Sequence, residues 1–565
     1  VPLQQVNAAS PNRPPVVSDA APDFVKTVTA AMLAGLGDAL PVSALPPDGT
    51  WPMGTTRWEK RNIAEEIPIW KEELCTQCNH CVAACPHSAI RAKVVSPEAM
   101  ANAPSSLHSL DVKSRDMRGQ KYVLQVAPED CTGCNLCVEV CPAKDRQNPE
   151  IKAINMMSRL EHVEEEKVNY EYFLNLPEID RTKLERIDIR TSQLISPLFE
   201  YSGACSGCGE TPYAKLITQL FGDRMMVANA TGCSSIWGAS APSMPYTTNS
   251  KGHGPSWANS LFEDNAEYGL GMYLGVKQSR ERVAEMVKAA LAAEIPADLK
   301  AAMQDWLDNM DVSEGTRERA EALTAVLEKY QDQCDKCAAL YKEKQFFVKR
   351  SHWIFGGDGW AYDIGYGGLD HVLASGENVN VMVFDTEVYS NTGGQSSKAT
   401  PAAAIAKFAA SGKKTKKKDL GMMAMSYGYV YVAQISMGAD KNQTLKAIAE
   451  AEAYDGPSLI IAYAPCINHG LKAGMGCSQL EAKLAVDCGY WATYRYNPAL
   501  KEKGENPFVL DSKEPTADFR EFLLGEVRYS SLLKQYPETA EALFAKTEQD
   551  AKERLNNYKR LAGKA

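Results

Sequence analysis

The stretch Cys75-Thr76-Gln77-Cys78-Asn79-His80-Cys81-Val82-Ala83-Ala84-Cys85-Pro86 decides how the first part of the chain must fold. Its cysteines follow the spacing Cys-x2-Cys-x2-Cys-x3-Cys-Pro, and the same spacing returns from Cys131 to Pro142. Three cysteines at this spacing put three thiolates on one tight loop, whereas the fourth cannot curl back to the same point. The pattern is typical of thiolate-bound [4Fe–4S] clusters, and its repetition predicts two of them.

The fourth cysteine of each array is expected to bind the cluster held by the other array, as in two-cluster ferredoxins. A pair of zinc knuckles is the alternative, but zinc sites need neither a third cysteine at this spacing nor the Cys-Pro step. We therefore predict a small α+β ferredoxin-like domain over residues 59–155, with residues 91–125 as an inserted loop or hairpin. The first cluster would take Cys75, Cys78, Cys81 and Cys141, and the second Cys131, Cys134, Cys137 and Cys85.

The composition is that of a globular chain with several domains, since 45% of the 565 residues are hydrophobic and 23% are charged. The formal net charge of −10 argues against nucleic-acid binding, and the one basic run, 413–418, is interpreted as a solvated loop. We find no apolar run of about 18 residues that would span a membrane, and no signal peptide. The 16 cysteines are therefore expected to be reduced thiols in a cytoplasmic protein.

The rest of the chain falls into segments that differ in amino-acid composition. Residues 1–58 are rich in Pro, Ala and Ser, with one helix candidate at 24–40, and are expected to be an arm from a preceding domain. Because the first residue is Val1, we expect a processed chain or a piece of something longer. Residues 156–194 are charged and are expected to be a helical linker.

From 195 to 565, short apolar runs followed by glycine-rich turns alternate with helical stretches. This pattern predicts a doubly wound, mostly parallel α/β sheet, interrupted at 275–345 by a helical hairpin. Ligands of such sheets bind in the loops at the carboxyl ends of the strands.

Further cysteines lie on those loops. Cys205 and Cys208 belong to Cys-Ser-Gly-Cys-Gly-Glu, Cys233 follows an apolar strand, and Cys466 follows another. Spacing alone leaves two interpretations open, namely a third cluster, or one CxxC redox pair beside two inert core thiols.

The remaining cysteines carry weaker signals. Cys334 and Cys337 form a CxxC inside the predicted helical insertion, where no second pair is in sight. Cys477 and Cys488 are expected to pack as small hydrophobic side chains.

A second kind of motif, Gly356-Gly357-Asp358-Gly359, follows an apolar strand and precedes a helical run at 364–374. Glycines let a diphosphate approach the backbone closely, the helix start offers free N–H groups, and the aspartate offers oxygen to Mg²⁺. The next apolar strand ends at Asp385-Thr386. This arrangement is typical of thiamine diphosphate sites, although Thr386 stands where Asn is usual. A glycine-rich turn without a cofactor is the alternative.

Cysteine arrays followed by this site resemble the C-terminal half of pyruvate:ferredoxin oxidoreductase, in the 2-oxoacid:acceptor oxidoreductase family. The resemblance runs from about residue 50 to the end. Its most specific stretches are Cys205–Glu210, Thr231–Trp237, Trp257–Asp264, Gly357–Trp360 and Thr386–Gln395.

The resemblance also implies which residues bind each cofactor. A proximal [4Fe–4S] cluster beside the thiamine would be held by Cys205, Cys208, Cys233 and Cys466. Mg²⁺ would be bound by Asp358, the Thr386 side chain and the Val388 carbonyl. Asn391 would reach the substrate side and is the catalytic candidate. The residues around the cofactor would be Glu210, Cys233, Gly357, Asp358, Gly359, Trp360, Thr386, Glu387, Val388, Tyr389, Ser390 and Asn391.

The implied reaction is oxidative decarboxylation of pyruvate with coenzyme A to acetyl-CoA and CO2. Electrons would leave through three [4Fe–4S] clusters to an external ferredoxin or flavodoxin. In the family, a separate N-terminal domain holds the thiamine pyrimidine and supplies its activating Glu, and no equivalent is recognisable here. We therefore expect this chain to be inactive alone, as part of a larger polypeptide or one subunit of a split enzyme, and to work as a homodimer.

Other functions remain as alternatives. The chain could be an electron-transfer module in which 195–565 is a non-catalytic scaffold. It could serve a sister enzyme acting on 2-oxoglutarate, a branched-chain 2-oxoacid or indolepyruvate. A thiamine decarboxylase without redox function conflicts with the eight cysteines of the two arrays.

Overall fold

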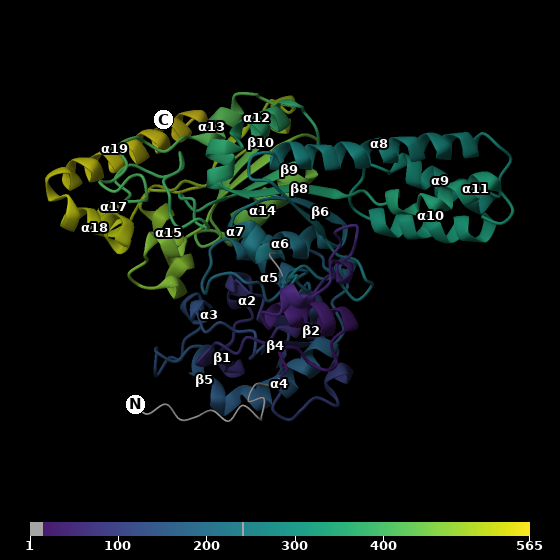
Figure 1. The fold of residues 1–565 in the computed structure, drawn as a ribbon, viewed down its shortest axis with the longest axis horizontal. Coiled ribbons are helices and arrows are strands. Elements are labelled where there is room, and N and C mark those ends of the chain that lie inside the picture. Colours follow the sequence, from purple (N-terminus) through teal and green to yellow (C-terminus); the bar gives the residue numbers. More distant parts are fainter. Residues whose placement is uncertain (1–14, 240–241, 565) are drawn as a thin grey trace.

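The computed structural model describes residues 15–239 and 242–564, and Figure 1 shows two bodies and a helical projection. The lower body carries the early part of the chain. The upper body carries the later part on a large twisted sheet, and the projection leaves it sideways. The parts of the predicted arm at 1–14 lie outside the described residues.

The lower body consists of short antiparallel strands around the cysteine arrays. Its elements are β1 (Glu66–Trp70), α2 (His80–Ala84), β2 (Ile90–Val95), β3 (Leu110–Asp111), β4 (Lys121–Val126), α3 (Leu136–Glu139), β5 (Ile154–Ser158) and α4 (Arg159–Asn175). β1 pairs with β5, and β4 lies between β2 and β3. The predicted α+β ferredoxin-like fold is thus confirmed, and residues 91–125 form an antiparallel hairpin.

Helix α4 differs from its expected role as a linker. Tyr170 and Phe173 on this helix are buried in the same apolar cluster as Ile67 and Val123 of the strands. The charged residues of the segment leave these side chains free to pack. Residues 159–175 therefore complete the core of the ferredoxin-like domain.

The upper body is organised by a sheet that, within the described residues, has the strand order β13-β12-β10-β11-β9-β8-β6-β7. Its strands are β6 (Met225–Ala230), β7 (Ser256–Ser260), β8 (Ser351–Gly357), β9 (Asn380–Asp385), β10 (Tyr431–Ile435), β11 (Ser458–Tyr463), β12 (Tyr494–Tyr496) and β13 (Phe508–Leu510). The strands from β7 to β10 are parallel, whereas β12 and β13 join antiparallel at one edge. The predicted mostly parallel α/β fold is confirmed.

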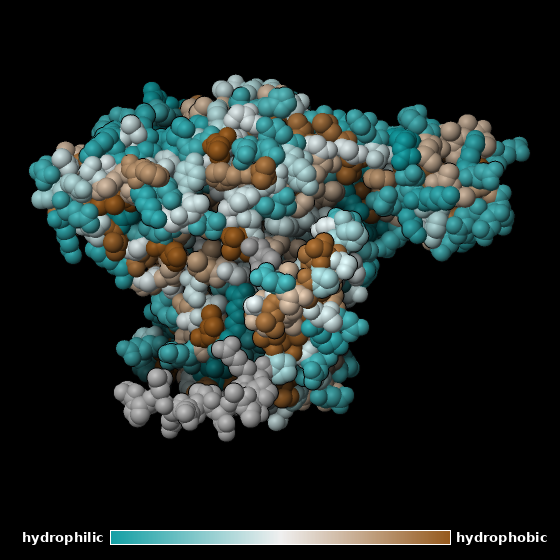
Figure 2. Space-filling model, in the orientation of Figure 1, coloured by the Kyte–Doolittle hydropathy of each residue, from teal (hydrophilic) through white to brown (hydrophobic). Residues whose placement is uncertain are grey.

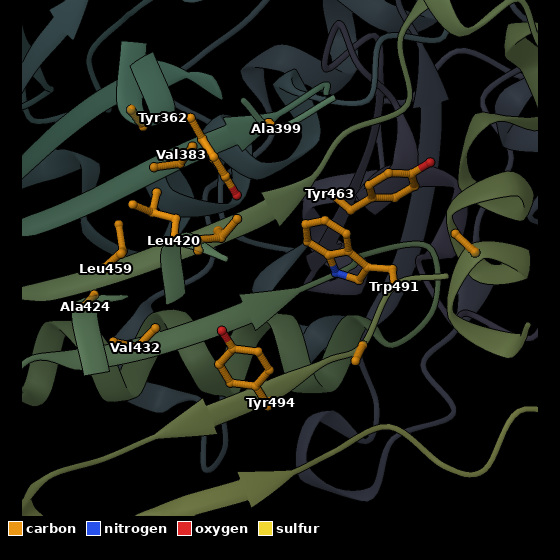
Figure 3. Packing of buried hydrophobic residues seen from close by; sticks show 14 of the residues in the cluster. Tyr362, Val383, Ala399, Leu420, Ala424, Val432, Leu459, Tyr463, Trp491 and Tyr494 are labelled. Carbon is orange, nitrogen blue, oxygen red and sulfur yellow. The ribbon is translucent and has the colours of Figure 1, made fainter. Parts of the chain in front are cut away.

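Both faces of the sheet are covered, because successive strand residues point to opposite sides. Val381 and Val383 enter one core, and Met382 and Phe384 the other. Figure 3 shows the first core, in which Val383, Leu459 and Val432 come from neighbouring strands. Its helices are α8 (Asn265–Leu291), α12 (Tyr366–Ala374), α13 (Leu420–Met425), α15 (Ser478–Asp487), α17 (Phe519–Gly525), α18 (Val527–Gln535) and α19 (Pro537–Leu561). The other face packs on α5 (Ile189–Ser192), α6 (Thr211–Phe221), α7 (Cys233–Ala239) and α14 (Lys441–Ala453).

The insertion is larger than the predicted hairpin. Helix α8 starts against the sheet and runs out of the body, where α9 (Ala297–Asp308) and α11 (Asp335–Lys342) pack against it and α10 (Thr316–Tyr330) packs on α9 and α11 (Figure 1). This bundle has its own core around the fully buried Trp306. Pro296 and the left-handed Gly315 break the segment between helices. Figure 2 shows mostly hydrophilic residues on the surface of the projection.

The described part of the arm packs against the upper body. A π-helical turn, Val25–Thr29, leads into α1 (Ala30–Leu33), so the predicted helix ends earlier than expected. The Trp51 indole donates a hydrogen bond to the Pro242 carbonyl at 3.1 Å, and its ring stands edge-on to Phe24 with centroids 5.0 Å apart. Among the helices of the described residues, none combines the length and apolar character needed to cross a membrane.

Candidate functional site

The eight cysteines of the arrays surround two separate small cavities of about 20 Å³ each. Each cavity takes three thiols from one array and the fourth from the other array, as the spacing predicts. The first is lined by Cys75, Cys78, Cys81 and Cys141. The second is lined by Cys131, Cys134, Cys137 and Cys85. All sixteen cysteines are free thiols.

The two arrays wrap their cavities in the same way. The residues on either side of the second cysteine take left-handed backbone angles in both, with φ of 59° at Gln77 and Asn79 and 67° and 66° at Gly133 and Asn135. These turns aim backbone N–H groups at sulfur, since Gln77 donates to the Cys75 thiol at 3.3 Å and Gly133 to the Cys131 thiol at 3.4 Å. Hydrogen bonds of this kind tune cluster potentials.

Burial makes these thiols reluctant to ionise on their own. It raises the pKa of Cys131 to about 12, and it raises the pKa values of Cys81 and Cys137 well above their ordinary value. A thiolate at these positions therefore needs bound metal to stabilise its charge. In the described residues, no three His, Cys, Asp or Glu side chains are grouped as the ligands of a single ion. The thiols instead surround open space, as the ligands of a multi-iron cluster must.

A third cavity, of about 120 Å³, places four further cysteines beside Thr386, Ser390 and Asn391 of the loop after β9. It lies where the loops after β6, β9 and β11 meet the start of α6. Gly207 and Gly209 let these loops close, because a Cβ atom would lie 2.4 Å from the Met475 carbonyl oxygen and 2.6 Å from the Pro465 carbonyl oxygen. Its lining includes Cys205, Cys208, Cys233, Cys466, Glu210, Thr386, Ser390 and Asn391.

Contacts inside this cavity connect the cysteines to the loop after β9. The Cys233 thiol lies 3.1 Å from the Ser390 hydroxyl. The Asn468 amide group lies 3.6 Å from the Cys466 sulfur and donates to the Ser390 carbonyl at 3.2 Å. Glu210 accepts from the Trp237 indole at 2.6 Å, and burial raises the pKa of Glu210 to about 7.

The three residues expected to bind Mg²⁺ converge. The Thr386 hydroxyl oxygen lies 3.0 Å from the Asp358 carboxylate and 3.0 Å from the Val388 carbonyl oxygen. Burial, and then the neighbouring Asp385, raise the pKa of Asp358 well above its ordinary value. The raised pKa favours the protonated form of Asp358, whereas a bound cation would favour the ionised carboxylate. One carboxylate, one hydroxyl and one carbonyl form an all-oxygen set of the kind that Mg²⁺ prefers.

The structure adds two partners to this triad that no sequence motif indicated. The Ser397 hydroxyl donates to the second carboxylate oxygen of Asp358 at 2.6 Å. The ring of His469 lies 2.6 Å from the carbonyl oxygen of Thr386 through Nε2. Ser397 thus fixes the orientation of the Asp358 carboxylate, and His469 fixes the orientation of the Thr386 peptide group.

Glu387 faces away from the cavity. It lies between Thr386 and Val388 with φ of 60°, and its buried carboxylate pairs with Lys417 at 3.1 Å and Arg528 at 2.8 Å. Although burial opposes ionisation, these two cations lower the pKa of Glu387 to about 2. The predicted cofactor contact of Glu387 is thus limited to its backbone.

The interpretation of 413–418 as a solvated loop is wrong at Lys417. This side chain is only 8% exposed and pairs with Asp385 at 2.7 Å as well as with Glu387. The residues between Lys413 and Lys417 are exposed, which is the pattern that the sequence suggested. Charge composition alone did not show that one lysine of the run would turn inward to the two acidic groups.

The Gly356–Trp360 segment shapes the site mainly with its backbone. The Trp360 side chain is fully buried and packs over Gly356, where a Cβ atom would lie 2.3 Å from the indole. A Cβ atom on Gly359 would lie 2.6 Å from the Tyr389 ring, whereas Gly357 has open space. Asn391 is exposed and lines the third cavity.

The other cysteines do not line these three cavities, although the half-buried Cys477 follows Gly476, which packs against the Cys134 carbonyl. The Cys334 sulfur caps α11 by accepting from the Cys337 N–H at 3.2 Å. Cys488 is buried in the first core of the sheet, as expected of a small hydrophobic side chain.

Fold and site together define a thiamine diphosphate-binding domain joined to a two-cluster ferredoxin-like domain. Residues 339–462 match the family described as thiamine pyrophosphate enzyme, C-terminal TPP binding domain, and residues 74–144 match the 4Fe-4S dicluster domain. Residues 279–334 match the pyruvate-ferredoxin oxidoreductase insertion domain, and residues 10–64 a domain of unknown function named EKR.

The chain is homologous to pyruvate-flavodoxin and pyruvate:ferredoxin oxidoreductases. It is 66% identical, over its full length, to a probable pyruvate-flavodoxin oxidoreductase of Escherichia coli, of which it covers 47%. It is 60% identical to the pyruvate-flavodoxin oxidoreductase of Enterobacter agglomerans and 56% identical to the pyruvate:ferredoxin oxidoreductase of Moorella thermoacetica, covering 96% of this chain and 46% of each relative. The chain thus spans about half the length of the curated relatives it matches.

A solved 2-oxoglutarate:ferredoxin oxidoreductase from Magnetococcus marinus, with 2-oxoglutarate, coenzyme A and succinyl-CoA bound, aligns more distantly. The alignment covers 47% of this chain and 65% of that chain at 14% identity, with a TM-score of 0.28. Similarity at this level adds nothing to the functional argument.

Proposed function

We propose that this chain is the cofactor-carrying part of an enzyme that oxidatively decarboxylates pyruvate with coenzyme A to acetyl-CoA and CO2. The observation that supports it most is the third cavity, in which four thiols share one lining with Thr386 and Asn391. Four thiols that can hold a cluster lie in one cavity with residues of the thiamine motif. This arrangement favours a decarboxylation whose electrons leave through that cluster. The high identity to pyruvate oxidoreductases favours pyruvate over another 2-oxoacid.

In this proposal the residues have defined roles. Asp358, Thr386 and the Val388 carbonyl hold Mg²⁺, with Ser397 orienting the carboxylate. Thiamine diphosphate, when bound, supplies the electron sink for decarboxylation. Asn391 stands at the open side of the cavity, where substrate would enter, and is the catalytic candidate. The proximal cluster is held by Cys205, Cys208, Cys233 and Cys466.

Contacts between the domains support an order for the three clusters. The Ser206 hydroxyl donates to the Thr132 carbonyl at 3.4 Å, and the His87 ring lies 2.9 Å from the Ala204 carbonyl oxygen. Thr132 and His87 both line the cavity of the Cys131 set. Electrons would therefore pass from the proximal cluster to the Cys131 set, and then to the Cys75 set on the way out.

The wider assembly follows from the same proposal. An external ferredoxin or flavodoxin would accept the electrons, and a further domain or subunit would grip the thiamine pyrimidine. The homodimer, the cytoplasmic location and the domain boundaries at 58 and 194 remain predictions.

One experiment separates this function from that of a pure electron-transfer module. The complete enzyme that contains this chain is mixed anaerobically with pyruvate, and cluster reduction is followed by EPR without an external acceptor. We expect reduction by pyruvate in preference to 2-oxoglutarate or a branched-chain 2-oxoacid, and no reduction in Asp358→Ala. Thiamine-independent reduction, or no reduction by any 2-oxoacid in a sample with full iron and thiamine, would contradict the proposal.

A further inference from the structure

The two cysteine arrays share a feature that lies outside their motifs. In each array the carbonyl groups of the first two residues after the third cysteine accept hydrogen bonds from one lysine ammonium. After Cys81, the carbonyls of Val82 and Ala83 accept from Lys215, the second at 2.9 Å. After Cys137, the next two carbonyls accept from Lys152, at 2.6 and 3.4 Å. A lysine ammonium group thus occupies the equivalent position in each of the two cysteine arrays.

The two lysines come from different parts of the chain. Lys152 lies two residues before β5 and belongs to the ferredoxin-like domain. Lys215 lies on α6 of the thiamine domain and reaches across the domain boundary. The symmetry therefore does not follow from the internal repeat alone, because only one of the two lysines lies near its array in sequence.

Lys215 is the more deeply buried of the two, with 1% of its surface exposed. Its ammonium group has three N–H donors. They are used by the carbonyls of Val82, Ala83 and Cys85, the last at 3.2 Å. Hydrogen bonds to neutral carbonyls satisfy the donors but do not cancel the charge. A buried ammonium of this kind is costly unless an anion lies nearby.

The geometry shows where the compensating anion would be. The carbonyls that bind Lys215 lie between Cys81 and Cys85, which line different cavities. A [4Fe–4S]²⁺ core bound by four thiolates carries a net negative charge, and one-electron reduction adds one more. A cation fixed between two such groups stabilises the reduced form of each more than its oxidised form.

We propose that Lys215 is the counter-ion that the thiamine domain supplies to the two ferredoxin-like clusters, where it raises both reduction potentials. Lys152 does the same at the equivalent place in the other array, with a smaller effect because it is half-buried and partly screened by solvent. Lys215 thereby makes electron transfer out of the thiamine domain more favourable. The inference rests on the cluster assignments made above.

Charge and hydrogen bonding are separable by substitution. Lys215→Gln keeps N–H donors but removes the charge, whereas Lys215→Met removes both. Lys152→Gln makes the same change at the equivalent place, and Lys300→Gln makes it at an exposed position on the projection. Each variant is prepared anaerobically as the complete enzyme, its iron is measured, and its clusters are titrated against potential with EPR detection.

We expect Lys215→Gln to lower the potentials of both ferredoxin-like clusters, Lys152→Gln to lower them less, and Lys300→Gln to leave them unchanged. A purely structural role predicts that Lys215→Met loses stability while Lys215→Gln keeps normal potentials, and that outcome would overturn the proposal. If Lys215→Gln loses iron, Lys152→Gln decides, because unchanged potentials in that variant contradict the shared mechanism. Missing iron in the unsubstituted enzyme would instead refute the cluster assignment.

Discussion

Arg528 on α18 donates a hydrogen bond to Glu387 at 2.8 Å, and so connects the C-terminal helices to the turn that carries Thr386 and Val388. Arg528 also pairs with Glu526 at 2.6 Å, and both of its partners are buried. Glu387 has a left-handed backbone, which is uncommon for a residue with a side chain. The ion pair therefore holds the Thr386–Val388 turn in a conformation that the backbone alone would not favour.

Replacing Arg528 with Met should destabilise the upper body by about 3–5 kcal/mol, because it leaves Glu387 and Glu526 as buried charges without this partner. Mg²⁺-dependent thiamine binding should weaken in the same variant as the turn relaxes. Denaturant unfolding and a thiamine diphosphate titration measure the two effects. Arg520→Met, which breaks the exposed pair with Glu541, is the control and should change neither. Equal stability of both variants would refute this account.

The hydroxyl of Thr386 is expected to be a metal ligand in place of the usual Asn. Thr386→Val keeps the shape of the side chain but removes the oxygen, and should weaken Mg²⁺-dependent thiamine binding by at least about tenfold. Thr386→Asn restores a side-chain oxygen and should bind with affinity near that of the unsubstituted chain. Calorimetric titration with Mg²⁺ and thiamine diphosphate compares them. Normal affinity in Thr386→Val would exclude the hydroxyl as a ligand.

Loss of one thiol from the third cavity should remove one cluster only. Cys466→Ser is expected to lower the iron content from about twelve to about eight atoms per chain, and to leave the EPR signals of the two ferredoxin-like clusters intact. Cys334→Ser, which changes the cap of α11, is the matched control and should keep full iron. Eight iron atoms in the unsubstituted enzyme, prepared anaerobically, would show that the third cavity holds no cluster.

His352 on β8 should make stability depend on pH. Burial, and then the charges of Arg350, Arg280 and Arg224, lower the pKa of His352 to about 3. Below pH 6.5 the unfolded chain binds a proton that the folded chain refuses, so stability falls as pH falls from 6.5 toward 3. The slope contributed by one such group is at most about 1.4 kcal/mol per pH unit.

Unfolding midpoints of the protein and of His352→Gln, compared between pH 7 and pH 5, test this expectation. The substituted protein should lose less stability on acidification, since glutamine takes up no proton. Identical dependence on pH in the two proteins would assign the acid sensitivity to other groups. The comparison concerns slopes, because the substitution also changes packing against Tyr273.

Local patterns predicted the parts of this molecule that depend on short stretches of chain. The Cys-x2-Cys spacing fixes which thiols can share a loop, and the Gly-Asp-Gly after a strand fixes the position of Asp358. Apolar runs bounded by glycine likewise predicted the parallel strands, because each strand is formed by one short stretch of chain. The exchange of the fourth cysteines between arrays also followed from geometry, since Cys85 and Cys141 cannot return to their own loops.

Contacts between distant segments were beyond such patterns. Ser397 contacts Asp358 and His469 contacts the Thr386 carbonyl, yet neither belongs to a motif that distinguishes it from other polar residues. Lys417 turned inward because Asp385 and Glu387 lie beneath it, which composition does not show. The prediction of a linker is wrong over α4, because apolar residues such as Tyr170 and Phe173 are scattered among the charged residues of that segment.

Helix α6 fixes the spacing between three parts of the molecule. It starts just after Cys208, and its Tyr213 hydroxyl lies between the Tyr463 carbonyl and the Met437 N–H, at 2.9 Å from each. Two residues further, Lys215 is anchored in the ferredoxin-like domain, and every residue of the helix is buried. A buried helix that contacts both domains in this way leaves the domains little freedom to move apart and so increase the distance that electrons must cross. In the proposed function, control over electron transfer would then lie in the reduction potentials of the three clusters, because α6 limits any change in the distances between them.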